Sequence, residues 1–263
     1  MPRIPSVLLL ASLAFAAAAC ATPPQLRLIP RVTRFEVDGD FGAADSGGSI
    51  SSKSDASALG LDDEDAITPQ IELDFAAFHI SAHHTGASFR GDGRTESTLR
   101  FRGEEIAADS EVRSEFDVAL LAADIVYDVV QTNVVDVGVG VGAGAFTYDL
   151  SVRTTSGPDA SVESDETVPI GYLVVRVGTA PGAGLRFVGY ARGLTGTLQD
   201  DEATYLDLDG RLSLDIWSVG PASFAVCGGY RYILVDYKHD GSDGKLEIDV
   251  SISGPYVGIE IVF

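Results

Sequence analysis

Long runs in which apolar and polar residues alternate constrain this chain more than any other feature. From Leu206 to Ile216, every second residue is leucine, isoleucine or glycine, and the residues between them are aspartate, arginine or serine. Alternation with a period of two indicates β-strands that have one apolar face, and helical periodicity is nearly absent after the N-terminal apolar segment. The sequence therefore predicts an all-β protein.

The alternation divides the chain into clear strands and one weaker strand. The clear strands lie at 31–43, 68–85, 112–130, 134–153, 163–178, 185–198, 204–218, 223–239 and 245–263, and the weaker one lies at 49–58. Within 68–85 the apolar phase shifts at Ala76-Ala77, which predicts a β-bulge. Pro255 predicts a bulge or a gap in the ladder of the last strand, because proline donates no backbone hydrogen bond.

Strand length and connection length distinguish a membrane barrel from a soluble one, since alternation alone leaves open which face is inside. The predicted strands reach about 15 to 20 residues, against roughly 5 to 6 in soluble sheets. Short connections alternate with polar ones along the chain. The short ones are Val130–Val134, Thr179–Gly184 and Val219–Ser223, and the polar ones lie near 86–111, 154–162, 199–203 and 239–244. Short periplasmic turns and polar outer loops are typical of barrels that span the outer membrane.

The strand number follows from counting back from the C-terminus. If the last strand runs toward the periplasm, 68–263 supplies eight strands and 58–67 becomes a periplasmic turn. The strand at 31–43 raises the number to ten if 49–58 returns beside it. We therefore expect an antiparallel transmembrane β-barrel of 8 to 10 strands within residues 31–263.

The N-terminus has the character of an export signal over residues 1–20, because Arg3 precedes an apolar run from Val7 to Ala19. Residues 21–30 are then a short segment ahead of the barrel. Cys20 follows three alanines and resembles the cysteine of a lipoprotein box, which predicts lipidation of its thiol. Ordinary signal-peptidase cleavage near Ala19 or Ala21 is the alternative.

The C-terminal strand carries a second resemblance. Its last residues place Val257, Ile259, Ile261 and the terminal Phe263 on one face. Together with the export signal and the strand and loop rhythm, this ending resembles the bacterial outer-membrane β-barrel superfamily, whose members commonly close with an aromatic residue. The resemblance implies location in the outer membrane, contact with its lipid, and recognition of the last strand by the barrel assembly machinery. It implies neither a substrate nor an oligomeric state.

Composition excludes several classes of function. The formal charge is -21 with only 18 lysines and arginines, whereas nucleic-acid binding needs clustered positive charge. Cys20 and Cys227 are the only cysteines, so neither a disulfide framework nor a CxxC site is available. We expect no nucleic acid, cofactor or metal.

The strand phases predict which charges face the lumen. If the apolar residues face lipid, the opposite face brings arginines and carboxylates inward, where they should pair because an isolated buried charge is costly. The predicted set is Arg176, Arg186, Arg192, Arg211, Arg231, Glu72, Asp74, Asp124, Asp128, Asp207, Asp209, Asp215, Glu247 and Glu260. Carboxylates outnumber arginines in this set, so some are expected to be hydrated, protonated or bound to a cation.

One short motif points to catalysis. His79 and Ser81, followed by His83, share the inward phase of one strand, and the His-x-Ser pair resembles that of outer-membrane lipid A 3-O-deacylases. In that family the pair faces lipid, whereas the phase here places it in the lumen, which favours a polar lining. A nucleophilic serine also needs a base within hydrogen-bond reach.

The acidic runs and the glycine run have simpler structural interpretations. The acidic runs Asp62–Asp65 and Asp200–Glu202 lack the spaced ligands of a calcium loop and are interpreted as solvated turns. The glycine run Gly138–Ala145 lacks the lysine of a nucleotide loop, and we expect its glycines to make room in a crowded lumen or to permit strong strand curvature.

No catalytic set emerges, so the sequence favours a non-enzymatic outer-membrane barrel that is structural or closed. A narrow pore for small solutes is one alternative, and a lipid-A-modifying or lipid-binding barrel is another. An interior of 8 to 10 strands is narrow enough for side chains to fill.

Overall fold

A computed structural model describes residues 23–44, 53–101, 104–156, 160–179, 184–198, 201–241 and 244–263, and these residues are all-β. Within them, no helix is long and apolar enough to cross a membrane. The export signal 1–20 and Cys20 lie outside the described residues. Their processing and lipidation stay predictions.

The strands occupy most of the described chain. The N-terminal part supplies β1 (Gln25–Ile29), β2 (Arg31–Ala44), β3 (Ser54–Asp55), β4 (Glu64–Ile67), β5 (Gln70–Phe75), β6 (Phe78–Arg94), β7 (Leu99–Phe101) and β8 (Glu104–Ile106). The rest supplies β9 (Glu111–Gln131), β10 (Val135–Thr154), β11 (Ser161–Thr179), β12 (Leu185–Leu198), β13 (Asp201–Val219), β14 (Ala222–Gly241) and β15 (Gly244–Val262).

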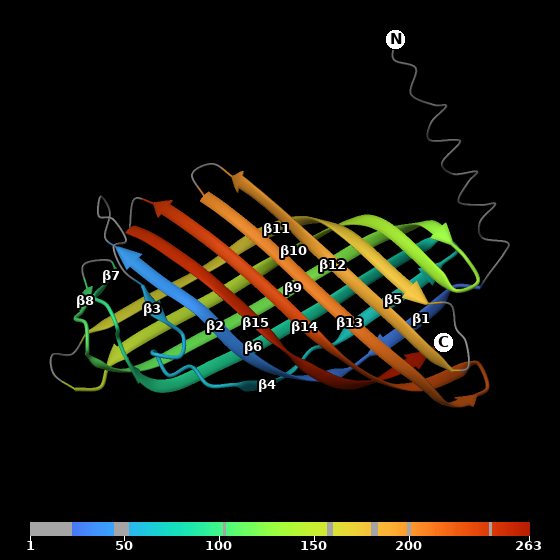
Figure 1. Ribbon diagram of the computed structural model, residues 1–263, viewed down its shortest axis with the longest axis horizontal. Helices are drawn as coiled ribbons and strands as arrows, with labels where there is room; N and C mark the ends of the chain where they lie inside the picture. The colour runs from blue at the N-terminus through green and yellow to red at the C-terminus, as the bar shows by residue number, and fades with distance from the viewer. Residues whose placement is uncertain are drawn as a thin grey trace, which may run out of the picture.

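These strands close into an antiparallel barrel (Figure 1). The last strand, β15, pairs with β14 on one side and with β1 and β2 on the other, so the main sheet has no open edge at this seam. Around the ring, β1 and β2 together form one wall strand, and β4 and β5 together form the next. The strands β6 and β9 to β15 add eight more, which gives a ring of ten among the described residues. The fold class and its upper strand number are confirmed.

Ten strands arise by a different route from the one expected. Ala76-Ala77 is a tight turn between β5 and β6, not a bulge, and Ala76 has a φ of 55°. The predicted strand 68–85 is therefore two strands. The segment 58–67 is not a periplasmic turn, because Glu64–Ile67 pairs with β2 in the barrel wall. Residues 49–52 of the weak strand 49–58 lie outside the described residues, and Ser54–Asp55 from the rest of it pairs with β2.

The wall also begins earlier than predicted. Gln25–Ile29 pairs with β5 and β15, so part of the segment 21–30 belongs to the barrel. This strand was missed because it is only five residues long and Pro30 separates it from β2.

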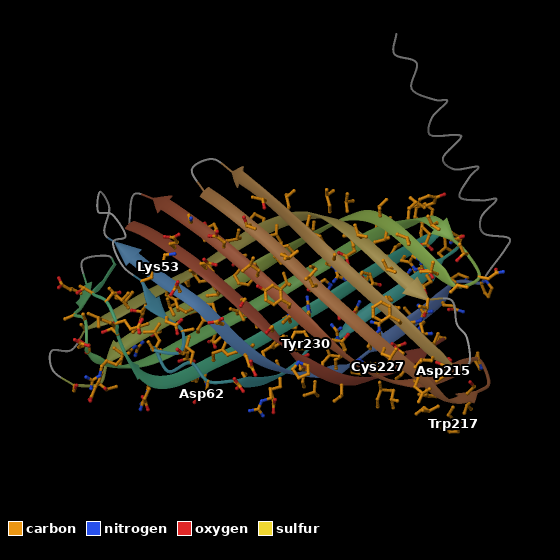
Figure 2. All side chains as sticks on the ribbon, in the orientation of Figure 1. Lys53, Asp62, Asp215, Trp217, Cys227 and Tyr230 are labelled. Carbon is orange, nitrogen blue, oxygen red and sulfur yellow. The ribbon has the colours of Figure 1, made fainter. Side chains whose placement is uncertain are left out.

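The two ends of the barrel differ. Tight turns at 76–77, 132–134 and 220–221 lie at the end that also holds Phe263, here named the turn end. The opposite end, the loop end, carries longer polar connections and the small β7–β8 hairpin (Figure 1). Lys53 and Asp62 lie toward the loop end, and Asp215 and Trp217 lie toward the turn end (Figure 2). The polar connections lie at the loop end as expected, but they are not all long, because two residues each separate β12 from β13 and β14 from β15.

Each long strand changes its chemistry between the two ends, and β9 shows this clearly. Toward the turn end, Leu121 and Ile125 are exposed on the outer face while Asp124 is buried inside. Toward the loop end the pattern reverses, with Phe116 buried inside and Arg113 exposed outside. The turn-end half therefore has the surface of a membrane barrel, and the loop-end half has that of a soluble barrel.

The outer face of the turn-end half forms an apolar band, which includes Ile71, Ile80, Leu121, Ile125, Val139, Val141, Leu173, Val175, Leu212, Leu214, Val226, Val257 and Ile259. Aromatic pairs gather near its turn-end edge. Phe78 lies against Tyr127 at 5.2 Å between ring centroids, and Trp217 stacks on Phe224 at 5.8 Å. Girdles of aromatic residues mark the membrane interface in such barrels.

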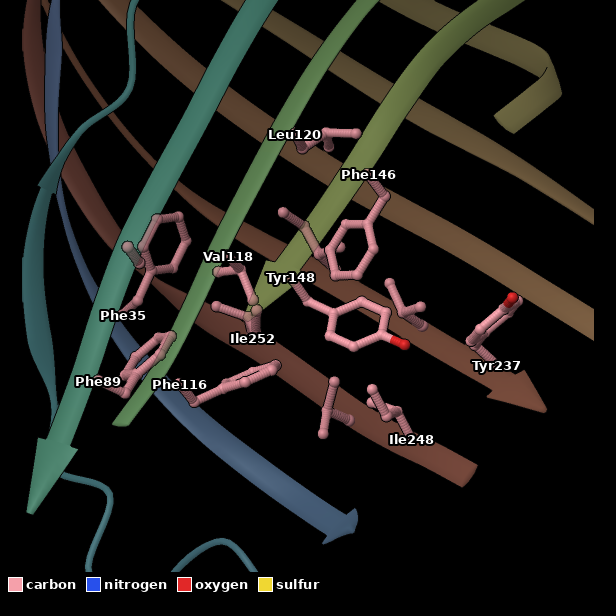
Figure 3. Packing of buried hydrophobic residues seen from close by; sticks show 14 of the residues in the cluster. Phe35, Phe89, Phe116, Val118, Leu120, Phe146, Tyr148, Tyr237, Ile248 and Ile252 are labelled. Carbon is pink, nitrogen blue, oxygen red and sulfur yellow. The ribbon is translucent and has the colours of Figure 1, made fainter. Parts of the chain in front are cut away.

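Inside the loop-end half, apolar side chains from many strands form one core (Figure 3). Within it, the ring centroid of Phe116 lies 5.0 Å from that of Phe41 and 6.3 Å from that of Phe89. This core fills the lumen of the loop-end half, whereas the charged side chains described below lie in the turn-end half.

Two glycines permit close approaches in the wall. A Cβ on Gly142 would lie 2.2 Å from the ring of Tyr172, which confirms that the glycine run makes room in the lumen. A Cβ on Gly254 would lie 1.7 Å from the carbonyl oxygen of Arg34. At Gly254-Pro255 the β15–β2 ladder has the predicted gap, and its register continues unchanged on both sides.

Candidate functional site: the charged lumen

Arginine and carboxylate side chains occupy the lumen of the turn-end half. At its centre, Arg231 of β14 places Nε and Nη2 each 2.9 Å from the carboxylate of Asp207 on β13. Arg192 of β12 reaches the same carboxylate at 3.2 Å and Asp124 of β9 at 2.8 Å. Arg231 also donates to the hydroxyl of Thr85 on β6 at 2.5 Å. The guanidinium groups thus join strands from several sides of the barrel.

A second group surrounds Glu72 of β5. Arg211 of β13 donates to both carboxylate oxygens of Glu72 at 2.9 Å and lies 2.9 Å from Glu260 of β15. The hydroxyl of Tyr190 on β12 donates to Glu72 at 3.1 Å. Glu260 in turn accepts from Arg186.

A third group involves the N-terminal strand. Arg31 of β2 pairs with Asp209 at 2.8 Å, and the hydroxyl of Tyr256 donates to Asp209 at 2.7 Å. The guanidinium carbon of Arg31 also lies 4.6 Å from the centre of the Tyr256 ring. Arg31 is only 1% exposed, so its charge is fully removed from water.

The network continues to the turn-end mouth. Arg27 of β1 pairs with Asp74, and Arg176 of β11 pairs with Asp136 of β10. His79 lies between two carboxylates, with Nδ1 2.6 Å from Asp74 and Nε2 2.8 Å from Asp128.

Most of the predicted lumen charges meet in this network. The exceptions are Asp215, which lies exposed toward the turn end, directly before the register shift in β13, and Glu247. Three charged members were missed, namely Arg27, Arg31 and Asp136. Arg27 was missed because its short strand β1 was not predicted, and Arg31 was missed because it shares the phase of Phe35, which the prediction turned toward lipid.

Glu247 was placed in the lumen wrongly. Its side chain lies on the outer face at the loop end, 3.2 Å from Lys53 and 3.1 Å from Lys238, and its neighbours Ile248 and Val250 are buried inside. The prediction assumed that apolar residues face lipid along the whole strand. Partial burial opposes ionisation, but hydrogen bonds from Lys238 and Lys53 lower the pKa of Glu247.

The revised set is nearly balanced in charge. The described network holds seven arginines, which are Arg27, Arg31, Arg176, Arg186, Arg192, Arg211 and Arg231. It holds eight carboxylates, which are Glu72, Asp74, Asp124, Asp128, Asp136, Asp207, Asp209 and Glu260. The predicted excess of carboxylates therefore shrinks to one.

The His79 and Ser81 pair is inside the barrel, as its phase predicted. The Ser81 hydroxyl donates to Asp124 at 2.9 Å, and the ring of His79 contacts Asp74 and Asp128. Both side chains therefore face the lumen and not the lipid. His83 is also buried there, 3.8 Å from Asp207.

The acidic runs lie apart from this network. Asp62 and Asp63 are exposed, whereas Glu64 and Asp65 belong to β4. Asp200 lies outside the described residues.

The C-terminal residues lie on the outer face at the seam. Val257, Ile259 and Phe263 are exposed, and Ile261 is half-buried. The backbone of Phe263 exchanges hydrogen bonds of 2.9 and 3.2 Å with Leu26 of β1. The residues of the predicted assembly signature thus form the strand that closes the barrel.

Comparison with known proteins shows which solved structures have a similar fold. No family model and no curated protein matches the sequence. Among solved structures, the outer membrane protease OmpT from Escherichia coli is similar with a TM-score of 0.51 and 10% identity, over 90% of this chain and 97% of OmpT. The translocator domain of the autotransporter NalP from Neisseria meningitidis has a TM-score of 0.38 and 11% identity, over 97% of this chain and 95% of that chain. Ail of Yersinia pestis has a TM-score of 0.33 and 10% identity, over 91% and 97%.

At such low identity the likeness to OmpT concerns the fold alone. The apolar band and the aromatic pairs at its edge are independent features of this chain, and they match what the bilayer requires of a closed barrel. The chain thus has the fold of the bacterial outer-membrane β-barrels.

Proposed function

We propose that this chain is a closed, non-catalytic outer-membrane barrel in which the charged lumen forms the barrier. The observation that carries the proposal is the burial of Arg31, Arg192, Arg211 and Arg231, each at most 2% exposed and each paired with a carboxylate. A solute crossing this layer would have to separate charges that have no water to replace their partners.

The apolar core of the loop-end half supports the same proposal. Phe35, Phe89 and Phe116 are fully buried there, so a polar solute that passed the charged layer would next meet a dry aromatic interior. Two barriers of opposite chemistry in series favour a closed barrel over a narrow pore.

Planar-bilayer recording tests this proposal. The purified wild type should show no steady conductance, and Arg211→Ala or Arg231→Ala should open small or intermittent currents because each removes a cross-lumen partner. Arg113→Ala is the matched control, since Arg113 lies exposed on the outer face and pairs with Asp92. It should remain as silent as the wild type. Large, steady conductance from the wild type would overturn the closed barrel and favour a pore.

Outer-membrane lipid is the partner that the outer face fits. A shallow groove of about 600 Å³ between β12 and β15 is lined largely by apolar side chains, among them Leu212, Val226 and Val257. Its place in the apolar band suits an acyl chain. A lipid A deacylase would instead need its catalytic groups at the lipid face. Incubation with lipid A should release no acyl chain, whereas release that is lost in Ser81→Ala would contradict the non-catalytic assignment.

A further inference from the structure

Three potential metal ligands converge near the turn-end mouth of the lumen. His79 of β6, Asp128 of β9 and Asp136 of β10 come from three neighbouring strands. One nitrogen or oxygen atom from each lies within 4.8 Å of the others. This spacing lets a single ion contact all three.

His79 is held in the orientation that a metal ligand needs. Its Nδ1 lies 2.6 Å from Asp74, which leaves Nε2 directed at the other carboxylates, 2.8 Å from Asp128. Histidines that bind metals usually donate their second ring nitrogen to a carboxylate, which fixes the tautomer and the ring orientation. Asp74 would perform this task here.

Asp128 gives an independent indication of a missing ligand. Its side chain is 3% exposed, and its Oδ1 is buried without a hydrogen-bond partner among the described residues. Nη1 of Arg176 lies 3.8 Å from this oxygen, which is too far for a hydrogen bond. A buried carboxylate oxygen without a partner is costly, and a bound cation would remove that cost.

Local charge and access also permit a cation. Asp74, Asp128 and Asp136 are faced by two cations, Arg27 and Arg176, which leaves one negative charge. Asp136 and His79 keep 21% and 12% of their side-chain surface exposed, so ions can enter from the turn end.

We propose that His79 Nε2, Asp128 and Asp136 bind one divalent cation of the zinc class, with Asp74 positioning the histidine. One nitrogen and two carboxylate oxygens suit Zn²⁺ and leave a fourth position for water. Mg²⁺ and Ca²⁺ prefer oxygen ligands alone, so the histidine decides against them. Arg176 competes with the ion for Asp136. This site lies at the mouth of the charged network and does not involve the four buried arginines that carry the proposed barrier.

Calorimetric titration of the untagged, refolded full chain in detergent with ZnCl₂ tests the site. The wild type should bind one Zn²⁺ per chain. His79→Ala or Asp136→Asn should weaken binding at least about tenfold, because loss of a residue that merely hydrogen-bonds to a metal ligand already costs about that much. His84→Ala is the matched control, because His84 is exposed on the opposite face of the same strand. It should bind like the wild type. Zn²⁺ affinity that is unchanged in His79→Ala, or absent in the wild type, would overturn the site.

Two further measurements keep the test independent of variant folding. Wild-type protein loaded with Co²⁺ should show the absorption bands of a low-symmetry nitrogen and oxygen site, and added Zn²⁺ should remove them. Arg176→Gln should bind Zn²⁺ more tightly than the wild type because it removes the competing cation. Featureless Co²⁺ spectra, or Ca²⁺ binding as strong as Zn²⁺ binding, would contradict the proposal.

Discussion

Tyr190 donates a 3.1 Å hydrogen bond to Glu72, although β12 and β5 stand five positions apart in a ring of ten. Opposite walls of the barrel therefore touch through two side chains. Arg211 binds the same carboxylate from a third strand, so Glu72 links distant parts of the ring. This layer therefore braces the cross-section of the barrel.

Glu72→Gln should lower the free energy of unfolding by about 3 to 5 kcal/mol, because it removes one of the two carboxylates that pair with the buried Arg211. Urea unfolding in lipid vesicles measures this change. Glu247→Gln is the control, since Glu247 lies on the outer face near two lysines, and it should cost about 1 kcal/mol or less. Equal losses in the two variants would show that the lumen pair is no more important than a surface pair.

The turn between β5 and β6 shows where sequence reasoning fails locally. Strong turn signals come from glycine, proline, asparagine and aspartate, yet this turn is made by Ala76 and Ala77. Its φ of 55° at Ala76 is unusual for alanine, so the segment reads as one strand with a phase shift. The C-terminal strands were predicted well because their connections contain glycine or are plainly polar.

The position of Glu247 shows a different limit. Alternation predicts that Glu247 and Ile248 face opposite sides, and they do. It does not say which side is inside, because that depends on whether this part of the strand lies in lipid or beyond it. Arg211, Asp207 and Glu260 were placed correctly because they lie at the height of the apolar band. The partners of each charge depend on which strands meet across the lumen, and a single sequence does not contain that information.

Phe116→Ala should cost about 3 to 5 kcal/mol of unfolding free energy, because it leaves a cavity among Phe41 and Phe89 in the loop-end core. Leu121→Ala on the same strand is the control. Leu121 is 62% exposed in the apolar band, where lipid can fill the space. Urea unfolding in vesicles compares the two variants. A larger loss for Leu121→Ala would contradict the assignment of a dry core beside a lipid-facing band.

Asp149 belongs to a row of like charges on the outer face, beyond the apolar band. It lies between Asp117 and Asp165 on neighbouring strands, and partial burial together with these two carboxylates raises its pKa. A carboxyl group whose pKa is raised by folding favours the folded state at low pH, and that contribution is lost as pH rises through the folded pKa.

Asp149→Asn should therefore be more stable than the wild type at pH 7, by a few tenths of a kcal/mol as expected for exposed like charges. The difference should vanish at pH values below the ordinary carboxyl range. Urea midpoints measured across this pH range provide the test. Asp92→Asn is the control, because Asp92 pairs with Arg113 and its loss should not stabilise the barrel. A variant that is less stable than the wild type at pH 7 would contradict the repulsion.

Phe263 combines two roles that variants can separate. Its backbone closes the seam through the hydrogen bonds with Leu26, and the residue is exposed on the outer face, where the assembly machinery could contact its ring. Deletion of Phe263 removes both features, Phe263→Ala removes only the ring, and Phe263→Tyr keeps an aromatic ring. We expect deletion and Phe263→Ala to lower the outer-membrane yield of heat-modifiable barrel by a similar factor, whereas Phe263→Tyr keeps the yield near that of the wild type.

Gel mobility with and without boiling measures the folded fraction, since a closed barrel without free strand edges resists detergent until heated. Yields that fall on deletion but not in Phe263→Ala would assign the effect to the seam. Yields that stay unchanged in all three variants would remove Phe263 from assembly altogether.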